Sequence, residues 1–181
     1  DLNAFLLQFE TNMYNFYEKL GDTERSEQYR IDANNRYKAI EAYLWNEKHQ
    51  QWMDFDMRAK APIERVAASN FIPLSVFSQL LSKRPSIPID VNKSRLEKSF
   101  VALNQSDLVG IAGIKATDVK GTKQQWDAPN SWAPIVDILV EGLVKHCGSI
   151  SGATTYGRNI AKAWLETNLI AFQKSGFMYE K

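Results

Sequence analysis

The sequence has few of the features that mark several large classes of protein. It contains one cysteine, Cys147, so an internal disulfide framework is excluded. Because this cysteine lies at the end of an apolar helical pattern, we expect a buried or half-buried thiol that is not a nucleophile. No apolar run approaches the ~20 residues that a membrane-spanning helix needs, so no transmembrane segment is predicted. The opening stretch, DLNAFLLQFE, has neither a basic region nor a cleavage site, and we expect it to begin inside a folded element.

The sequence also has little net charge and few clusters of residues that could form a metal, nucleotide or nucleic-acid site. The 22 Lys and Arg residues nearly balance the 21 Asp and Glu residues, and no basic cluster alternates with aromatic residues, which disfavours nucleic-acid binding. The two histidines, His49 and His146, show no metal-ligand spacing, so we expect no metal. Gly-rich phosphate loops and nucleotide fingerprints are absent from the sequence, and no cofactor is expected. A length of 181 residues is sufficient for one domain with a real core.

Apolar residues recur at helical spacing over most of the chain and predict an all-α fold. Gly21 ends the first helix, Asp22 and Thr23 start the second, and Gly148 and Gly176 end the last two. Strand-like alternation is confined to short stretches such as WMDFD (52–56). The predicted helices span about residues 2–20, 22–44, 70–83, 92–103, 132–148 and 156–174, and Arg84, Pro85 and Pro88 end the third.

The connections between these helices are unequal in length. Within the pairs 1/2, 3/4 and 5/6 they are short, so the paired helices should lie antiparallel. Between pairs they are long, at about residues 46–68 and 104–131. In an array of antiparallel hairpins all pair-to-pair connections and both chain ends fall at one end. We therefore expect residues 1–3, 52–56, 124–132 and 178–181 to gather at one end of the hairpins, which we call the mouth. In a toroid of hairpins such an end is where a functional site is expected. A helical solenoid with long loops is the alternative.

The stretch QQWDAPNSWAP (124–134) has the composition of a binding loop. Trp126 and Trp132 can each offer a flat apolar face to a sugar ring and an indole N–H to its hydroxyls. Asp127 can accept hydrogen bonds from two hydroxyls, and Gln125 and Asn130 can both donate and accept. These five residues are the predicted substrate-binding set. In the alternative interpretation Trp132 is a core anchor at the start of a helix, and Asn130 belongs to a turn or cap.

This stretch resembles the second signature of the trehalases, the glycosidases that split α,α-trehalose into two glucose molecules. Further segments similar to the family follow the expected order over residues 1–181, and they are DLNAFL, YLWNEKHQQWMDFDM and FMYEK. The sequence departs from the family pattern at Ser131, where Gly or Ala is usual. It also departs at Lys115 and Lys123, where the family has Pro and Gly, which puts the path of that loop in question.

The resemblance implies an (α/α)6 barrel, a closed toroid of six helical hairpins. Residues 1–181 would then form a single domain, the C-terminal portion of the catalytic barrel. The implied function is inverting hydrolysis of trehalose to glucose, with the remainder of the barrel as a required partner. Glu180 in MYEK matches the family's general base, and the catalytic acid is expected upstream of Asp1. A non-catalytic sugar-binding helical module and a structural helical array are the alternatives.

Two glycosylation sequons bear on the location of the protein. Asn92 and Asn104 each stand two residues before a serine, but one or two sequons arise by chance in a chain of this composition. Trehalases occur as secreted, anchored and cytosolic proteins. The sequons favour an extracellular or membrane-anchored location slightly over a cytoplasmic one and do not decide it.

Residues 1–181 alone are expected to hydrolyse no trehalose. An inverting glycosidase needs a carboxylic acid to protonate the leaving oxygen and a carboxylate to activate water, and the sequence supplies only the second. Glucose release from trehalose by the purified chain measures this directly, and measurable hydrolysis would contradict it. Calorimetric titration with trehalose or an iminosugar separates a structural array, which binds neither, from a sugar-binding module.

Overall fold

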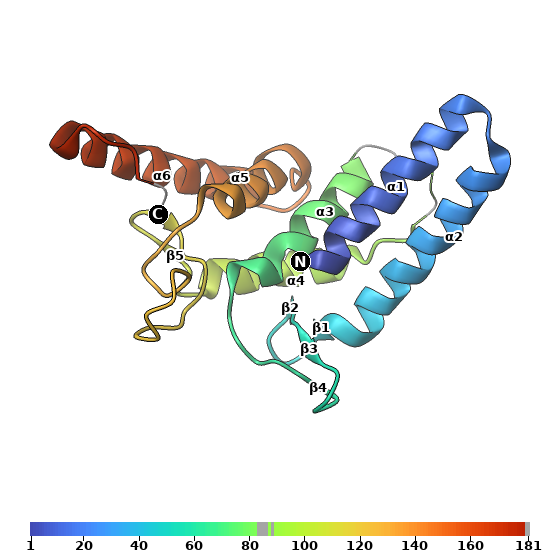
Figure 1. Ribbon diagram of the computed structural model, residues 1–181, viewed down its shortest axis with the longest axis horizontal. Coiled ribbons are helices and arrows are strands. Elements are labelled where there is room, and N and C mark those ends of the chain that lie inside the picture. Colours follow the sequence, from blue (N-terminus) through green and yellow to red (C-terminus); the bar gives the residue numbers. More distant parts are fainter. Residues whose placement is uncertain (83–86, 88, 180–181) are drawn as a thin grey trace.

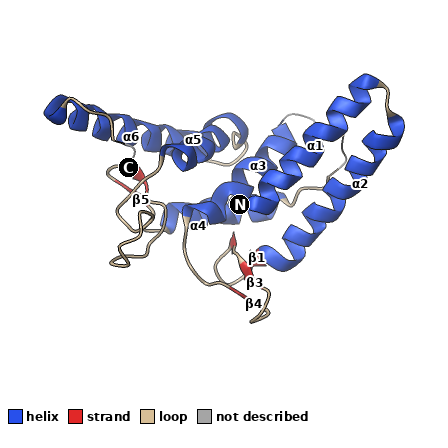
Figure 2. Cartoon of the chain, in the orientation of Figure 1, coloured by secondary structure: helices blue, strands red, loops and turns tan. Residues whose placement is uncertain are grey.

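Helical hairpins make up most of the molecule (Figure 1). The computed structural model describes residues 1–82, 87 and 89–179, so the predicted helix stop at Arg84, Pro85 and Pro88 lies outside the described residues. Within the described ranges no helix is both long enough and apolar enough to cross a membrane. The helices, which confirm the all-α prediction, are α1 (Leu2–Leu20), α2 (Thr23–Ala39), α3 (Ile72–Ser82), α4 (Lys93–Gln105), α5 (Ala133–Glu141) and α6 (Ala153–Ser175) (Figure 2).

Local capping explains where these helices begin and end. Asp22 caps α2 by accepting a hydrogen bond from the N–H of Arg25 at 3.1 Å. Asn92 caps α4 in the same way, and both starts are the predicted ones. Gly21 adopts a left-handed conformation (φ 73°) that ends α1. The sixth helix begins at Ala153, three residues before the predicted start at Tyr156, because the left-handed Gly152 (φ 82°) turns the chain there.

Three helices change their winding at an end, which periodicity did not predict. The second helix continues as the π-helix η1 (Ile40–Leu44), and the fifth continues as the π-helix η3 (Gly142–His146). The third is preceded by a turn of 3₁₀-helix, η2 (Ala68–Phe71). A π-turn inserts an extra residue per turn while apolar spacing stays close to helical, so the sequence predicts a continuous helix.

The strands are each two residues long and form three hairpins, all of which lie in the long connections. They pair as β1 (Trp45–Asn46) with β2 (Gln51–Trp52), β3 (Phe55–Asp56) with β4 (Ala61–Pro62), and β5 (Val109–Gly110) with β6 (Gly113–Ile114). The strand-like stretch 52–56 contains the end of β2 and all of β3, which agrees with the expectation that strand is confined to short stretches. The N–H of Met53 donates to the carbonyl of Leu44 at 2.8 Å, which extends the register of β1 and β2 by one residue before the chain enters the second hairpin.

Helix α3 lies at the centre of the packing. It contacts α4 within its own hairpin and also contacts α1 and α5 of the neighbouring hairpins. Nearly all of its residues are buried, including Leu74 and Phe77. Phe77 meets the rings of Tyr37 on α2 and Trp52 on β2 edge-to-face, each at a centroid distance of 5.2 Å. One core therefore joins α3 to α2 and to the β1–β2 hairpin.

Two glycines allow the helices of the last two hairpins to approach closely. A Cβ atom on Gly142 would lie 2.7 Å from the Cα of Ser75, so α3 and η3 can touch only if residue 142 has no side chain. A Cβ atom on Gly157 would lie 2.8 Å from the Cβ of Leu143, which sets the contact between α6 and η3. The spacing of α3, η3 and α6 thus depends on these two positions.

Replacing Gly142 by Ala is expected to destabilise the chain by about 1–3 kcal/mol, because the added methyl group must push the α3 backbone away. Urea unfolding monitored by circular dichroism measures this change. Gly148→Ala is the matched control, since a Cβ atom at Gly148 meets nothing within 4 Å. Equal midpoints for the two variants would show that the close contact between α3 and η3 does not constrain the fold.

Candidate functional site

The two long connections meet as paired extended segments. The N–H of Ala68 donates to the carbonyl of Ala116 at 2.9 Å, and the N–H of Asp118 donates to the carbonyl of Val66 at 3.3 Å. On its other side Ala116 donates to the carbonyl of Asn130 at 3.0 Å. Residues 115–118 therefore lie between residues 66–68 and residues 130–131. The prediction that the long connections gather at one end is confirmed for these segments (Figure 1).

The start of α1 lies at the same end, beside the segment that contains Asp54. The Asp54 carboxylate lies close enough to the Asp1 backbone nitrogen to interact with it electrostatically. The Asp1 carboxylate caps α1 by accepting a hydrogen bond from the N–H of Leu2. Asn3 accepts a hydrogen bond from Arg36 at 3.1 Å. Asp1 and Asp54 thus lie close together, as predicted for residues 1–3 and 52–56, and Asn3 joins α1 to α2 through Arg36.

The C-terminal part of the mouth is only partly described. Glu180, the predicted general base, lies outside the described residues, and its assignment remains a prediction from the resemblance. The preceding residues Met178 and Tyr179 are exposed. Helix α6 runs beside the β5–β6 hairpin. The Thr167 hydroxyl on this helix donates a hydrogen bond to the carbonyl of Ile111 in the hairpin turn, at 3.3 Å. The middle of α6 therefore lies next to the second long connection.

Two indoles form the most prominent feature of residues 124–132, which we call the Trp loop. The ring centroids of Trp126 and Trp132 lie 4.5 Å apart, with the ring planes inclined by 39°. Trp132 is 9% exposed and stands at the N-cap position of α5, which is the anchoring role given above as the alternative. Trp126 is 45% exposed. An outward-facing indole thus rests on an inward-facing one, and the outer ring offers a supported flat face to a ligand.

Hydrogen bonds within the Trp loop converge on the backbone of Gln125. Its carbonyl accepts from the Asn130 amide at 2.9 Å and from the Trp132 indole at 3.3 Å. The Gln125 side chain is exposed, so it points away from these contacts toward a ligand or solvent. Because two of the five predicted ligand residues donate to the third, the loop is held in one shape before anything binds. Their roles as ligands stay predictions.

The Asp127 carboxylate closes the other side of the Trp loop. One oxygen accepts from the Thr122 N–H at 2.5 Å, and the other accepts from the Thr122 hydroxyl at 2.6 Å. A carboxylate has about four lone-pair sites, so each oxygen can still accept from a sugar hydroxyl. Asp127 can therefore hold a ligand and brace the loop with the same group.

Thr122 and Thr117 are supporting residues that the sequence did not single out. The Thr117 hydroxyl donates to the Trp126 carbonyl at 3.1 Å, and the peptide bond between Ala128 and Pro129 is cis. The dense run of turn-forming residues signals a loop but not its internal hydrogen bonds. The departure of the sequence at Lys123 is accommodated by a left-handed backbone (φ 64°), a conformation for which Gly is favoured.

Titratable groups outside the Trp loop were compared with the requirements of a metal or nucleophile site over the described residues 1–82, 87 and 89–179. In the part of the chain that the structure describes, no three His, Cys, Asp or Glu side chains are grouped as metal ligands. Cys147 is 1% exposed, which confirms the predicted burial, and burial raises the pKa of its thiol. The thiol lies 3.1 Å from the Ser78 hydroxyl and is a packing residue between α3 and the end of η3.

Comparison with known proteins identifies similar sequences along the whole chain. The family model described as Trehalase matches residues 1–181. A trehalase from Arabidopsis thaliana is 32% identical over 100% of this chain and 28% of its own length. A trehalase from Homo sapiens is 33% identical over 100% of this chain and 29% of its own length. The chain thus spans less than a third of the length of these two relatives.

A solved structure of a trehalase has a similar fold. The neutral trehalase of Saccharomyces cerevisiae matches 99% of this chain with a TM-score of 0.78, at 22% sequence identity and over 33% of its own chain. The predicted fold class is therefore confirmed, and the three hairpins have the arrangement of part of a trehalase-type (α/α)6 barrel. The match favours this arrangement over the alternative of a helical solenoid.

The brace between Thr122 and Asp127 makes a prediction about the Trp loop. Thr122→Val removes the hydroxyl donor and should loosen residues 118–127, so trypsin should cleave faster after Lys120 and Lys123. Thr122→Ser keeps the hydroxyl and should be cleaved at the wild-type rate. Mass spectrometry of timed digests locates the cuts. Identical rates for the two variants would show that the hydroxyl does not hold the loop.

Proposed function

The chain belongs to the trehalase family, and we propose that it contributes the C-terminal portion of a catalytic barrel that hydrolyses α,α-trehalose to two glucose molecules. The observation that carries this proposal is the family match over residues 1–181. The Trp loop supports it, because a supported indole face and several amide and carboxylate groups lie together at one end of the hairpins.

In this proposal the Trp loop grips one glucosyl unit. The exposed face of Trp126 packs against the apolar face of the sugar ring, and Trp132 supports it from behind. The sugar hydroxyls, which can both donate and accept, form hydrogen bonds with Gln125, Asp127 and Asn130. Because the loop is held by its own hydrogen bonds, little conformational entropy is lost when the sugar binds.

The proposed reaction is a single displacement at the anomeric carbon. Glu180 takes a proton from a water molecule, whose oxygen attacks the anomeric carbon from the side opposite the glycosidic bond. A carboxylic acid from the remainder of the barrel gives its proton to the glycosidic oxygen, and the second glucose leaves. One C–O bond forms and one breaks, and the configuration at the attacked carbon inverts.

Two exposed apolar helix faces support the proposal that further hairpins complete the barrel. Phe9 and Phe16 are seven residues apart on α1 and are 52% and 57% exposed. On α6, at the other end of the hairpin array, Leu165, Leu169 and Phe172 share one face and are about half exposed or more. In a closed toroid these two faces are the ones that pack against neighbouring hairpins.

Glu180→Gln, made in a protein that contains the whole barrel, is expected to lower kcat for trehalose by at least about a hundredfold, because the amide cannot accept the proton of water. Glucose release measures this loss, with thermal unfolding as the check on folding. Glu166→Gln, which removes an exposed carboxylate from α6, is the matched control and should leave kcat unchanged.

The stereochemistry is tested on the same enzyme. Inversion predicts that nuclear magnetic resonance, recorded before mutarotation, detects equal amounts of the α and β anomers of glucose. Only the α anomer would contradict the single displacement. Near-normal kcat in Glu180→Gln would show that another residue is the base. Binding of trehalose with no release of glucose by the wild-type protein would favour the sugar-binding alternative.

A further inference from the structure

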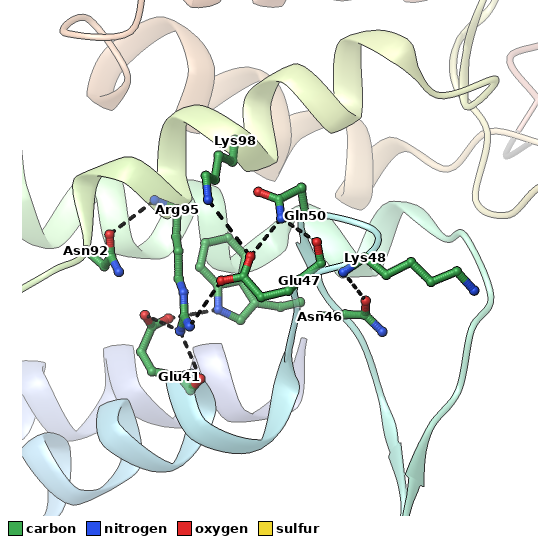
Figure 3. A network of polar contacts seen from close by, with 9 residues as sticks. Glu41, Asn46, Glu47, Lys48, Gln50, Asn92, Arg95 and Lys98 are labelled. Carbon is green, nitrogen blue, oxygen red and sulfur yellow. Dashed lines mark hydrogen bonds and ion pairs between the residues drawn. The ribbon is translucent and has the colours of Figure 1, made fainter.

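A half-buried ion pair joins the first two hairpins (Figure 3). Arg95 on α4 donates from one nitrogen to the Glu41 carboxylate and to the Glu41 backbone carbonyl, each at 2.9 Å. The other oxygen of the Glu41 carboxylate accepts from the Trp52 indole N–H, also at 2.9 Å. We call Glu41, Arg95 and Trp52 the clamp. It connects η1 at the end of α2, the β1–β2 hairpin and the start of α4.

The low exposure of the clamp strengthens the attraction between its charges, and the stacking of Arg95 favours arginine at this position. The side chains of Glu41 and Arg95 are only 14% and 22% exposed, so solvent screens their attraction much less than it screens a surface pair. The Arg95 guanidinium also lies over the Trp45 ring, 4.9 Å from its centroid. A lysine at this position could not stack a planar cation on that ring. The clamp therefore fixes both the distance and the orientation of the β1–β2 hairpin relative to α4.

Hydrogen bonds continue from this hairpin to the Trp loop. Buried Gln51, next to Trp52 in β2, accepts from the Asn70 amide of η2 at 3.1 Å. Two residues before Asn70, the N–H of Ala68 donates to the carbonyl of Ala116 at 2.9 Å. Ala116 in turn donates to the carbonyl of Asn130 in the Trp loop at 3.0 Å. A shift of the β1–β2 hairpin would therefore displace the segment on which the Trp loop is mounted.

We propose that Glu41 and Arg95 are positioning residues for the Trp loop, so that an ion pair on the second and fourth helices sets the geometry of the sugar site. The proposal rests on the proposed function, since it assigns these residues an effect on sugar binding. Neither residue belongs to the predicted substrate-binding set. Glu41 and Arg95 are 54 positions apart in sequence, and their side chains act through β2, η2 and residues 115–118.

The test compares Glu41→Gln and Arg95→Lys with a matched control in a protein that contains the whole barrel. Lys48→Ala is the control, because Lys48 lies in the turn of the same β1–β2 hairpin and pairs with Glu64 at 2.8 Å but is 70% exposed. All variants are assayed well below their unfolding temperatures. Steady-state kinetics with trehalose and hydrogen exchange of residues 45–56 and 115–132 are measured for each.

For both clamp variants we expect KM to rise about tenfold while kcat changes little, because the Trp loop contacts the sugar in both the ground state and the transition state. Hydrogen exchange should accelerate in residues 45–56 and also in residues 115–132. Lys48→Ala should match the wild type in every measurement. A purely structural role predicts a lower unfolding temperature, faster exchange confined to residues 45–56 and an unchanged KM, and that result would overturn the proposal.

Failure of the proposed function gives a different result. If the wild-type protein hydrolyses no trehalose, the proposed function is wrong whatever the clamp does. The exchange of residues 115–132 then still decides whether the clamp positions the Trp loop. Unchanged exchange there in both clamp variants would overturn the positioning proposal independently of activity.

Discussion

The close contact between α3 and η3 is the constraint on which the rest of the molecule depends. Because Gly142 has no side chain, the backbone of Ser75 can lie directly against it, and α3 is buried between the other two hairpins. The segments that lead into α3 and α5 are then forced side by side, and residues 66–68 and 130–131 pair with the two edges of residues 115–118. Helix packing thus places the loops that form the mouth.

The mouth illustrates how a loop can be rigid without regular structure. The Trp loop has no strand or helix over residues 124–130, yet Asp127, Asn130 and Trp132 each use a side-chain group to hold its shape. Gln124, Gln125, Trp126 and Pro129 remain exposed, and the Trp126 ring and the Gln125 amide are the predicted ligand groups among them. A sugar would then bind to a surface that is already arranged, with the reaction at the anomeric carbon assigned to Glu180.

Local patterns predicted the elements, whereas contacts between distant residues determined the site. Apolar spacing and caps such as Asp22 and Asn92 were sufficient for the six helices and for most of their ends. The π-turns at Ile40 and Gly142 were missed because apolar spacing continues through them. The pairing of Glu41 with Arg95, and the brace between Thr122 and Asp127, depend on how the chain folds back on itself, and no short-range pattern encodes them.

A crystal structure of the Glu180→Gln variant of the whole barrel with bound trehalose tests the central claim most directly. We expect one glucosyl ring to lie on the exposed face of Trp126, within hydrogen-bonding distance of Asp127 and Gln125. A water molecule should bridge residue 180 and the anomeric carbon, on the side opposite the glycosidic oxygen. Trehalose bound away from the Trp loop, or with residue 180 too far from the anomeric carbon for one water to bridge, would contradict the claim.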